Sequence, residues 1–180
     1  LRFGSILLRL LRHLDIPVCV IGPHAHPESS QPTLRTILHP ISLSGAYERS
    51  AALAVALAQY CKAMLTLMHV FDPDRGSQIT IGPSALNNLV PGDDLCPPIL
   101  TTETVGHVVP EVLRVANEIQ ADMIVLDVHA DSFFRSPQGE STAYEIIVSA
   151  TCPVLVLKVN PELVPVSLVA TELAPMFSVA

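Results

Sequence analysis

The sequence has little charge, more acidic than basic residues and no long apolar run, and each of these features excludes a class of protein. Charged residues make up 15% of the 180 residues and apolar residues 49%, so the chain can fill a hydrophobic core and is not expected to be disordered throughout. Its net charge of −7 argues against a general binder of nucleic-acid backbones or of anionic membrane surfaces. No apolar run reaches the ~18 residues of a membrane span, and arginines interrupt the first stretch, which is therefore not a signal peptide.

Cysteine is sparse as well, and no two cysteines form a CxxC pair. The four cysteines are Cys19, Cys61, Cys96 and Cys152. Two of them, Cys19 and Cys152, lie in or beside apolar runs, where an unpaired cysteine behaves as a small apolar side chain. We therefore expect a reduced, cytoplasmic protein without a disulfide framework or a zinc site.

Short apolar runs alternate with helical patterns along the chain. Buried parallel strands form continuous apolar runs because helices cover both faces of their sheet. The candidate strands are Thr36–His39, Met64–Val70, Met123–Asp127, Val154–Lys158 and, more weakly, Ile99–Thr102. Apolar residues recur at helical spacing after Ser44, from Val109 to Ile119 and from Ala143 to Ala150. This alternation predicts an α/β fold, an open doubly wound parallel sheet of about five strands with helices on both faces.

Proline-rich segments divide the chain. Residues 23–34 hold three prolines and no apolar run, which indicates a linker. Residues 72–98 hold five prolines, so at most a short helix fits there, at Ser84–Val90. The apolar tail, residues 159–180, is also interrupted by prolines and is not expected to form a central strand.

The first 22 residues repeat a pattern found near the end of the chain. With Ser5 aligned on Ser141, an offset of 136, three further residues coincide without a gap: Pro17, Val18 and Val20 with Pro153, Val154 and Val156. Both segments have the pattern of a helix opened by serine, then a turn, a proline and an apolar strand. A repeat this long indicates a repeated domain. We therefore expect residues 1–22 to be the last helix and strand of a preceding, truncated domain, and residues 35–158 to be a complete one; the chain also begins with Leu rather than Met.

Polar residues follow several predicted strands, at the edge where open parallel sheets bind their ligands. Histidines occur at this edge for three strands, at His39, His69 and His129. They are compatible with a metal or proton-relay cluster, or else each is a partly buried side chain satisfied by the backbone. Ser141 and Thr142 open a helix, whose free N–H groups favour a phosphate, although a hydroxyl there also serves as a simple helix cap.

The order and spacing of these segments resemble the universal stress protein family. The resemblance is carried by the strings RTILHP (35–40), LTLMHV (65–70), ADMIVL (121–126) and ATCPVLV (150–156), with the Ala-rich helix between the first two. It covers about Leu34–Lys158 as one domain, and residues 1–22 resemble the end of a preceding copy. The resemblance implies self-association or pairing with a second such domain, in tandem or as a dimer.

Nucleotide-binding members of that family carry Gly-x2-Gly-x9-Gly-Ser/Thr after the fourth strand, and this sequence departs from the pattern. The glycine positions hold Asp127, Ala130 and Glu140, whereas Ser141 matches. Gly139 substitutes for the third glycine if the loop is one residue shorter. Glycines let backbone N–H groups approach a phosphate, while carboxylates repel a triphosphate unless a cation intervenes. The family's acidic position after the first strand holds Ser42.

The resemblance therefore implies a degenerate site that binds ATP or AMP, with Mg, weakly or not at all. Its candidate residues are Pro40, Ser42, Val70, Asp127, His129, Ala130, Gly139, Ser141 and Thr142. No hydrolase elbow Gly-x-Ser-x-Gly and no dinucleotide motif Gly-x-Gly-x-x-Gly is present at the required places. We expect a non-catalytic regulatory or stress-response module. Two alternatives stay open: an ATP-binding universal stress domain with slow hydrolysis, and a cytoplasmic regulatory domain of a transporter.

Overall fold

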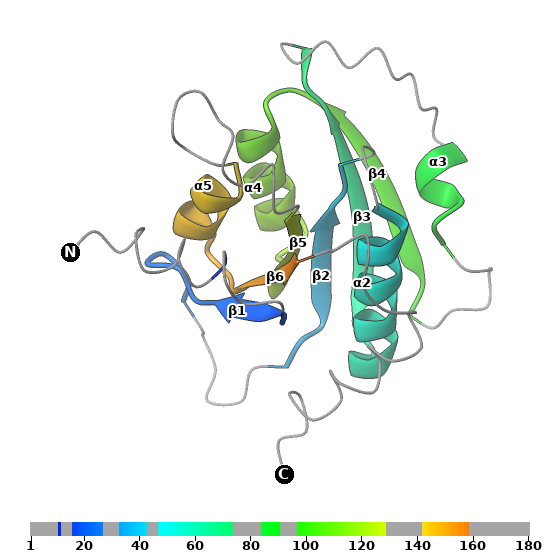
Figure 1. The fold of residues 1–180 in the computed structure, drawn as a ribbon, viewed down its shortest axis with the longest axis horizontal. Coiled ribbons are helices and arrows are strands. Elements are labelled where there is room, and N and C mark those ends of the chain that lie inside the picture. Colours follow the sequence, from blue (N-terminus) through cyan, green and yellow to red (C-terminus); the bar gives the residue numbers. More distant parts are fainter. Residues whose placement is uncertain are drawn as a thin grey trace.

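The computed structural model describes residues 11, 16–26, 33–42, 47–73, 84–90, 97–128 and 142–158, and these form one sheet between two layers of helices (Figure 1). The strands are β1 (Val18–Val20), β2 (Thr36–Pro40), β3 (Met64–Phe71), β4 (Ile99–Val105), β5 (Met123–Val128) and β6 (Val154–Lys158). The helices are α2 (Tyr47–Cys61), α3 (Ser84–Asn87), α4 (Val108–Glu118) and α5 (Thr142–Ser149). Within the described ranges, no helix has both the length and the apolar character that crossing a membrane requires.

The six strands lie in the order β1-β6-β5-β2-β3-β4. The five strands from β2 to β6 are parallel to one another, which confirms the predicted parallel sheet of about five strands. The sheet as a whole is mixed, because β1 pairs antiparallel with β6 at one edge. The order β6-β5-β2-β3-β4 is doubly wound, since the chain leaves the central strand β2 in one direction and later returns to its other side.

Two predicted elements differ from the structure by more than one residue at an end. The weak strand at Ile99–Thr102 is a seven-residue strand, β4, that continues to Val105. Its run is hard to see in the sequence because β4 is an edge strand whose residues are exposed or half-buried. The short helix is shorter than the predicted Ser84–Val90, because α3 ends at Asn87 and turns follow it, with the N–H of Leu89 donating to the carbonyl of Leu86.

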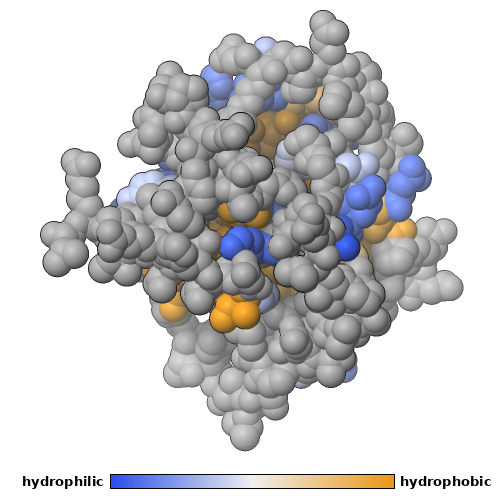
Figure 2. Space-filling model, viewed as in Figure 1, coloured by the Kyte–Doolittle hydropathy of each residue, from blue (hydrophilic) through white to orange (hydrophobic). Residues whose placement is uncertain are grey.

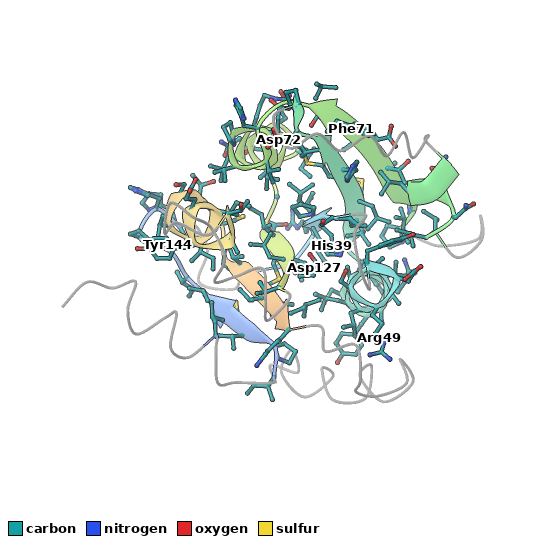
Figure 3. The ribbon with its side chains drawn as sticks, turned by 45° about the horizontal axis from the view of Figure 1, so that its top comes forward. His39, Arg49, Phe71, Asp72, Asp127 and Tyr144 are labelled. Carbon is teal, nitrogen blue, oxygen red and sulfur yellow. The ribbon has the colours of Figure 1, made fainter. Side chains whose placement is uncertain are left out.

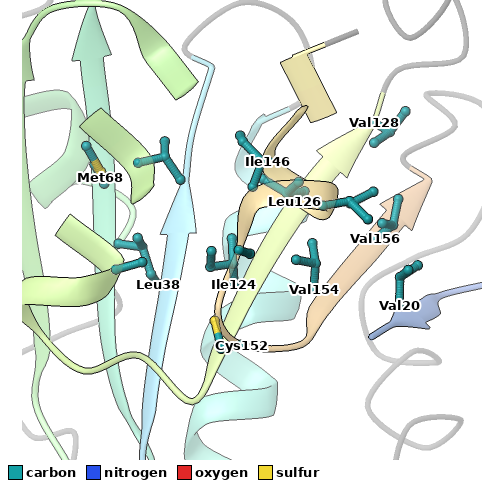
Figure 4. Packing of buried hydrophobic residues seen from close by; sticks show 14 of the residues in the cluster. Val20, Leu38, Met68, Ile124, Leu126, Val128, Ile146, Cys152, Val154 and Val156 are labelled. Carbon is teal, nitrogen blue, oxygen red and sulfur yellow. The ribbon is translucent and has the colours of Figure 1, made fainter. Parts of the chain in front are cut away.

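Residues alternate along each buried strand between two hydrophobic clusters, one on each face of the sheet. On one face, Leu38, Ile124, Val154 and Val156 pack with α4 and α5, and Figure 4 shows this cluster from close by. On the other face, seven buried strand residues pack with α2 and α3: Ile37, Leu65, Leu67, Met123, Val125, Leu155 and Leu157. The helices therefore cover both faces, as the continuous apolar runs predicted.

The apolar side chains are not all buried. Ile16, Ile21, Tyr60, Met64, Leu100 and Val105 are exposed. On the face of the molecule shown in Figure 2, apolar surface occurs as small patches beside polar side chains.

Asp122 holds the amino end of β2 beside β5. One of its carboxylate oxygens, Oδ2, accepts hydrogen bonds from the backbone N–H groups of Arg35 (2.8 Å) and Thr36 (2.9 Å), while its own N–H donates to the carbonyl of Thr36 (2.9 Å). These bonds set the two central strands side by side. The opposite, carboxyl ends of β2 and β5 are thereby placed next to each other.

Candidate functional site

The carboxyl ends of β2 and β5 form the switch point of the sheet. The connection that follows β2 runs through α2 on one face, whereas α5, which follows β5, packs on the other face. In open parallel sheets, such a point leaves a crevice beyond the strand ends, where ligands bind. The side chains of His39 and Asp127 lie here, close together at the ends of neighbouring strands (Figure 3).

His39 is the buried histidine of this edge. Its side chain is 0% exposed, and its Nδ1 lies 2.9 Å from the carbonyl oxygen of Val125 on β5. A carbonyl only accepts hydrogen bonds, so Nδ1 carries the hydrogen. Burial lowers the pKa of His39 below its ordinary value, because the interior disfavours the charged ring; the nearby Asp127 carboxylate opposes this shift.

Asp127 is held from the side of α2. The hydroxyl of Ser50, in the first turns of that helix, lies 3.2 Å from Asp127 Oδ2 and 3.0 Å from the carbonyl oxygen of Tyr47. Both are acceptors, so Ser50 donates and its single hydrogen is shared between them. Ser50 thus connects α2 to the end of β5.

His69, near the end of β3, contacts the segment that follows β2. Its Nδ1 lies 2.9 Å from the carbonyl oxygen of Ile41, and its ring packs edge-on against Phe71, with ring centroids 4.7 Å apart. The N–H of Ile41 donates in turn to the carbonyl of Met68 (2.7 Å). These contacts therefore hold the segment that leaves β2 against β3.

Two of the three histidines that the sequence placed at this edge lie against backbone carbonyls, in agreement with the second interpretation above. His39 and His69 lie on the same edge, but each uses Nδ1 for a carbonyl oxygen of a neighbouring segment. In the part of the chain that the structure describes, no three His, Cys, Asp or Glu side chains are grouped as a metal ion would require. His129 lies outside the described residues.

The structure brings four of the nine predicted site residues to this edge. Pro40 ends β2, Ser42 lies exposed just beyond it, Val70 is near the end of β3, and Asp127 is next to the end of β5. A fifth, Thr142, is the first residue of α5. The other four lie outside the described residues: His129, Ala130, Gly139 and Ser141.

Ser50 was missed by the sequence reasoning. It occupies the buried stripe of α2 with Ala54 and Ala58, at helical spacing, and is itself 0% exposed. A hydroxyl in an otherwise apolar stripe was the available signal, because a buried polar group needs a hydrogen-bond partner. Its partner, Asp127, is 77 residues away and could not be identified from spacing.

The described residues fit a phosphate poorly at the end of β5. A phosphate seated there on the α2 side would meet the Asp127 carboxylate, and two like unit charges 4 Å apart repel by about 4 kcal/mol at an effective dielectric constant near 20. The hydroxyls of Ser42 and Thr142 are compatible with polar ligand groups, but they do not offset that charge.

Comparison with known proteins finds one family that this chain resembles. Residues 97–158 match the sequence model of the universal stress protein family. No curated protein matches the chain in sequence. The predicted resemblance is therefore confirmed over residues 97–158 in sequence, and the solved structures below extend it to the fold.

Three solved structures share the fold at under 25% identity. A universal stress protein from Archaeoglobus fulgidus DSM 4304 aligns with 87% of this chain at 19% identity and a TM-score of 0.63, and this chain covers 56% of that protein's length. A universal stress protein in complex with cAMP aligns with 70% of this chain (98% of its own) at 18% identity, with a TM-score of 0.54. The universal stress protein from Archaeoglobus fulgidus in complex with dAMP aligns with 70% (99% of its own) at 19% identity, with a TM-score of 0.52.

Proposed function

We propose that this chain, which has the universal stress protein fold and the family's sequence pattern over residues 97–158, is a non-catalytic regulatory module with a degenerate nucleotide site. The observation that carries the proposal is the Asp127 carboxylate at the switch point, held there by Ser50. In the pattern of nucleotide-binding members, this position is a glycine. The module would act through the pairing of domains rather than through turnover of a nucleotide.

The charge at Asp127 supports loss of nucleotide affinity for two physical reasons. Glycine has no side chain, so a loop that contains it lets backbone N–H groups approach a phosphate; Asp127 adds a side chain and a negative charge at that place. In the partly buried position between β5 and α2, this charge is screened less than it would be in water. Both effects act against a triphosphate more strongly than against a neutral ligand.

Pairing of domains is supported by the register of β1 and β6. Val18 lies opposite Val156, Cys19 opposite Leu155, and Val20 opposite Val154. These are the residues that the offset of 136 relates to one another: Val18 corresponds to Val154, and Val20 to Val156. Val18 therefore lies opposite the counterpart of Val20, and Val20 lies opposite the counterpart of Val18. This reciprocal pairing is the pattern of a two-fold, isologous interface.

Leu11, which precedes β1 in the chain, follows the same symmetry. Leu11 is in a helix and is 7% exposed; its counterpart at the same offset is Ile147 of α5, which is 0% exposed. Both side chains belong to the same hydrophobic cluster, together with Val20 and Val156. Leu11 and β1, from the beginning of the chain, thus pack against the equivalent helix and strand of the domain, α5 and β6. This supports the proposal that residues 1–22 end a preceding domain and that the two domains pair through β1 and β6.

The second candidate is an ATP-binding domain with slow hydrolysis. It is favoured by the structures of this fold that hold cAMP and dAMP. A divalent cation bound by Asp127 would offset the repulsion of a phosphate. The two candidate functions therefore predict different affinities for ATP when magnesium is present.

Equilibrium titration of the full chain with a fluorescent ATP analogue, with and without Mg²⁺, separates them. We expect no saturation at micromolar analogue in either case, and a gain of affinity of about tenfold or more in the Asp127→Gly variant, since one unit of charge repulsion is removed. Asp72→Asn is the matched control, because Asp72 is a carboxylate beyond the end of β3, which β2 separates from β5. Micromolar saturation of the unaltered chain would overturn the degenerate site.

A further inference from the structure

The edge of β6 that β1 occupies also matches a second copy of β6. On the side that faces the hydrophobic cluster, β1 carries Val18 and Val20, and β6 carries valines at the corresponding positions, Val154 and Val156. Figure 4 shows Val20 beside the two valines of β6. Because the register is two-fold, β6 of a second copy would again place a valine opposite each valine of β6. The paired strands by themselves therefore do not distinguish β1 from a second copy of the chain.

Gly22, two residues beyond β1, is the position at which the two segments differ. It lies against the backbone of α5, and a Cβ added here would overlap the carbonyl oxygen of Ile147. The side chain of Ile147 is fully buried in the core, so close packing opposes a shift of the helix. At the offset of 136, the counterpart of Gly22 is Lys158. A second copy of β6 would thus bring a lysine to a place that fits glycine.

The direction of the chain after β1 adds a second difference. β1 ends at Val20, whereas β6 continues to Lys158, the counterpart of Gly22. Beyond Gly22 the chain turns, and the N–H of His26 donates to the carbonyl of Thr151 (3.1 Å), which lies between α5 and β6. A strand that runs straight on at this point does not make this hydrogen bond.

We infer that Gly22 makes the edge of β6 selective for a non-identical partner: this edge accepts a strand like β1, which is followed by a glycine and a turn, and rejects β6 of a second copy. The inference rests on the proposed pairing of domains through β1 and β6, and it adds which partner this edge takes. Selectivity of an interface arises from a clash with the wrong partner as well as from contacts with the right one. The chain therefore uses this edge for its own β1 and does not form a homodimer through it.

The two-fold symmetry of such a homodimer would double the clash. Lys158 of each copy would meet Ile147 of the other, so two overpacked contacts would form. Each is expected to weaken association by about tenfold, which gives about a hundredfold for the pair. With β1 in place, the edge has one such contact, and there the residue is Gly22.

Exchange of the two residues within the full chain tests the selectivity. Gly22→Lys should release β1 from α5, and the chain should stay monomeric because Lys158 still obstructs a second copy. In the double variant Gly22→Lys with Lys158→Gly, the edge is released and the obstruction is gone. Sedimentation velocity over chain concentrations of about 1–100 µM should then show a dimer that is about a hundredfold tighter than any dimer of Gly22→Lys. Equal association of these two variants would overturn the inference.

Two single variants are the matched controls. Lys158→Gly alone should stay monomeric, because β1 still occupies the edge. Ile21→Lys adds a lysine at an exposed position next to Gly22, so it should neither release β1 nor change the association of the chain.

Amide hydrogen exchange separates a failure of this inference from a failure of the proposed pairing. In the unaltered chain, we expect the β1 amides that bond to β6 to be protected at every chain concentration. Unprotected amides would mean that β1 and β6 do not pair in solution, so the proposed pairing would be wrong as well. Protection that is lost as a dimer forms would show that a second copy displaces β1, and only the selectivity would be wrong. This measurement uses the unaltered chain, so it decides the question even if Gly22→Lys does not fold.

Discussion

Cys19 lies opposite Leu155 in the antiparallel pair of β1 and β6, and the same two residues correspond at the offset of 136 that relates the beginning of the chain to its end. A residue that pairs with its own counterpart lies at a two-fold axis. The contact between these strands is therefore centred on Cys19 and Leu155. On either side of this centre, each valine of β1 lies opposite the counterpart of the other. The proposed pairing of two universal stress domains depends on this relationship.

Substitutions on the side of β1 that faces the core should lower the unfolding free energy, and substitutions on its exposed side should not. Val20 is 8% exposed and packs in the cluster with α5, so Val20→Asp buries a charge without a partner and is expected to cost more than about 2 kcal/mol of unfolding free energy. Cys19→Ser, on the exposed side of the same strand, is expected to change the unfolding free energy by no more than about 0.5 kcal/mol. Urea denaturation measures both, and equal effects of the two substitutions would contradict the assigned faces.

Gly22 should tolerate no side chain. A Cβ at this position would lie 2.2 Å from the carbonyl oxygen of Ile147, a backbone atom of α5. Gly22→Ala is therefore expected to destabilise the chain by about 1–3 kcal/mol, the usual cost of overpacking. Ile21→Ala is the neighbouring control, since Ile21 is exposed and its loss should have little effect. Thermal unfolding followed by circular dichroism compares the two, and a neutral Gly22→Ala would show that β1 does not lie against α5.

Removal of the Ser50 hydroxyl should weaken the attachment of α2 to β5. Hydrogen bonds to charged groups contribute about 1.5–3 kcal/mol, so Ser50→Ala is expected to lower the unfolding free energy by about that amount. In the Asp127→Asn background the same substitution should cost less, because the acceptor is no longer charged. A double-mutant cycle from urea denaturation gives the coupling, and zero coupling would mean that Ser50 and Asp127 do not interact in solution.

Cys152 should react slowly with alkylating reagents. It is buried, and burial raises its pKa to about 11, so almost none of it is the reactive thiolate at pH 8. Burial raises the pKa of Cys19 as well, but that side chain is exposed to the reagent. Mass spectrometry after brief iodoacetamide treatment is expected to show modification of Cys19 first, by a factor of about ten or more. The rate at Cys152 should increase with pH as the thiolate fraction grows; rapid labelling at pH 8 would show that the thiol is not buried.

The strands and helices around the core were predictable because their burial is local in sequence. Strands covered by helices on both sides are unbroken apolar runs, and Val154–Lys158 was predicted with the bounds that β6 has. At the edge of the sheet this signal weakens, which explains why β4 was predicted short. The strand at Val18–Val20 was predicted from the repeat, but its direction relative to β6 was not.

The site was predicted only in outline. The general rule that ligands bind beyond the carboxyl ends of parallel strands placed Pro40, Ser42, Val70 and Asp127 together, and the structure confirms their common edge. The contacts among His39, Ser50 and Asp127 were not predicted, because the hydrogen bonds to Val125 and Asp127 span 86 and 77 residues. A local sequence pattern does not show which polar groups of distant strands and helices will come into contact.

By itself, the sequence determined the fold class, the parallel central sheet and the repeat that relates the beginning of the chain to its end. Apolar periodicity and a constant offset between two segments are properties of the sequence alone. Only the tertiary structure decided that β1 closes the sheet edge antiparallel to β6, that Ser50 binds Asp127, and that Gly22 lies against the backbone of α5. These depend on distances between segments that are far apart in the chain, and such distances exist only once the helices have packed on the sheet.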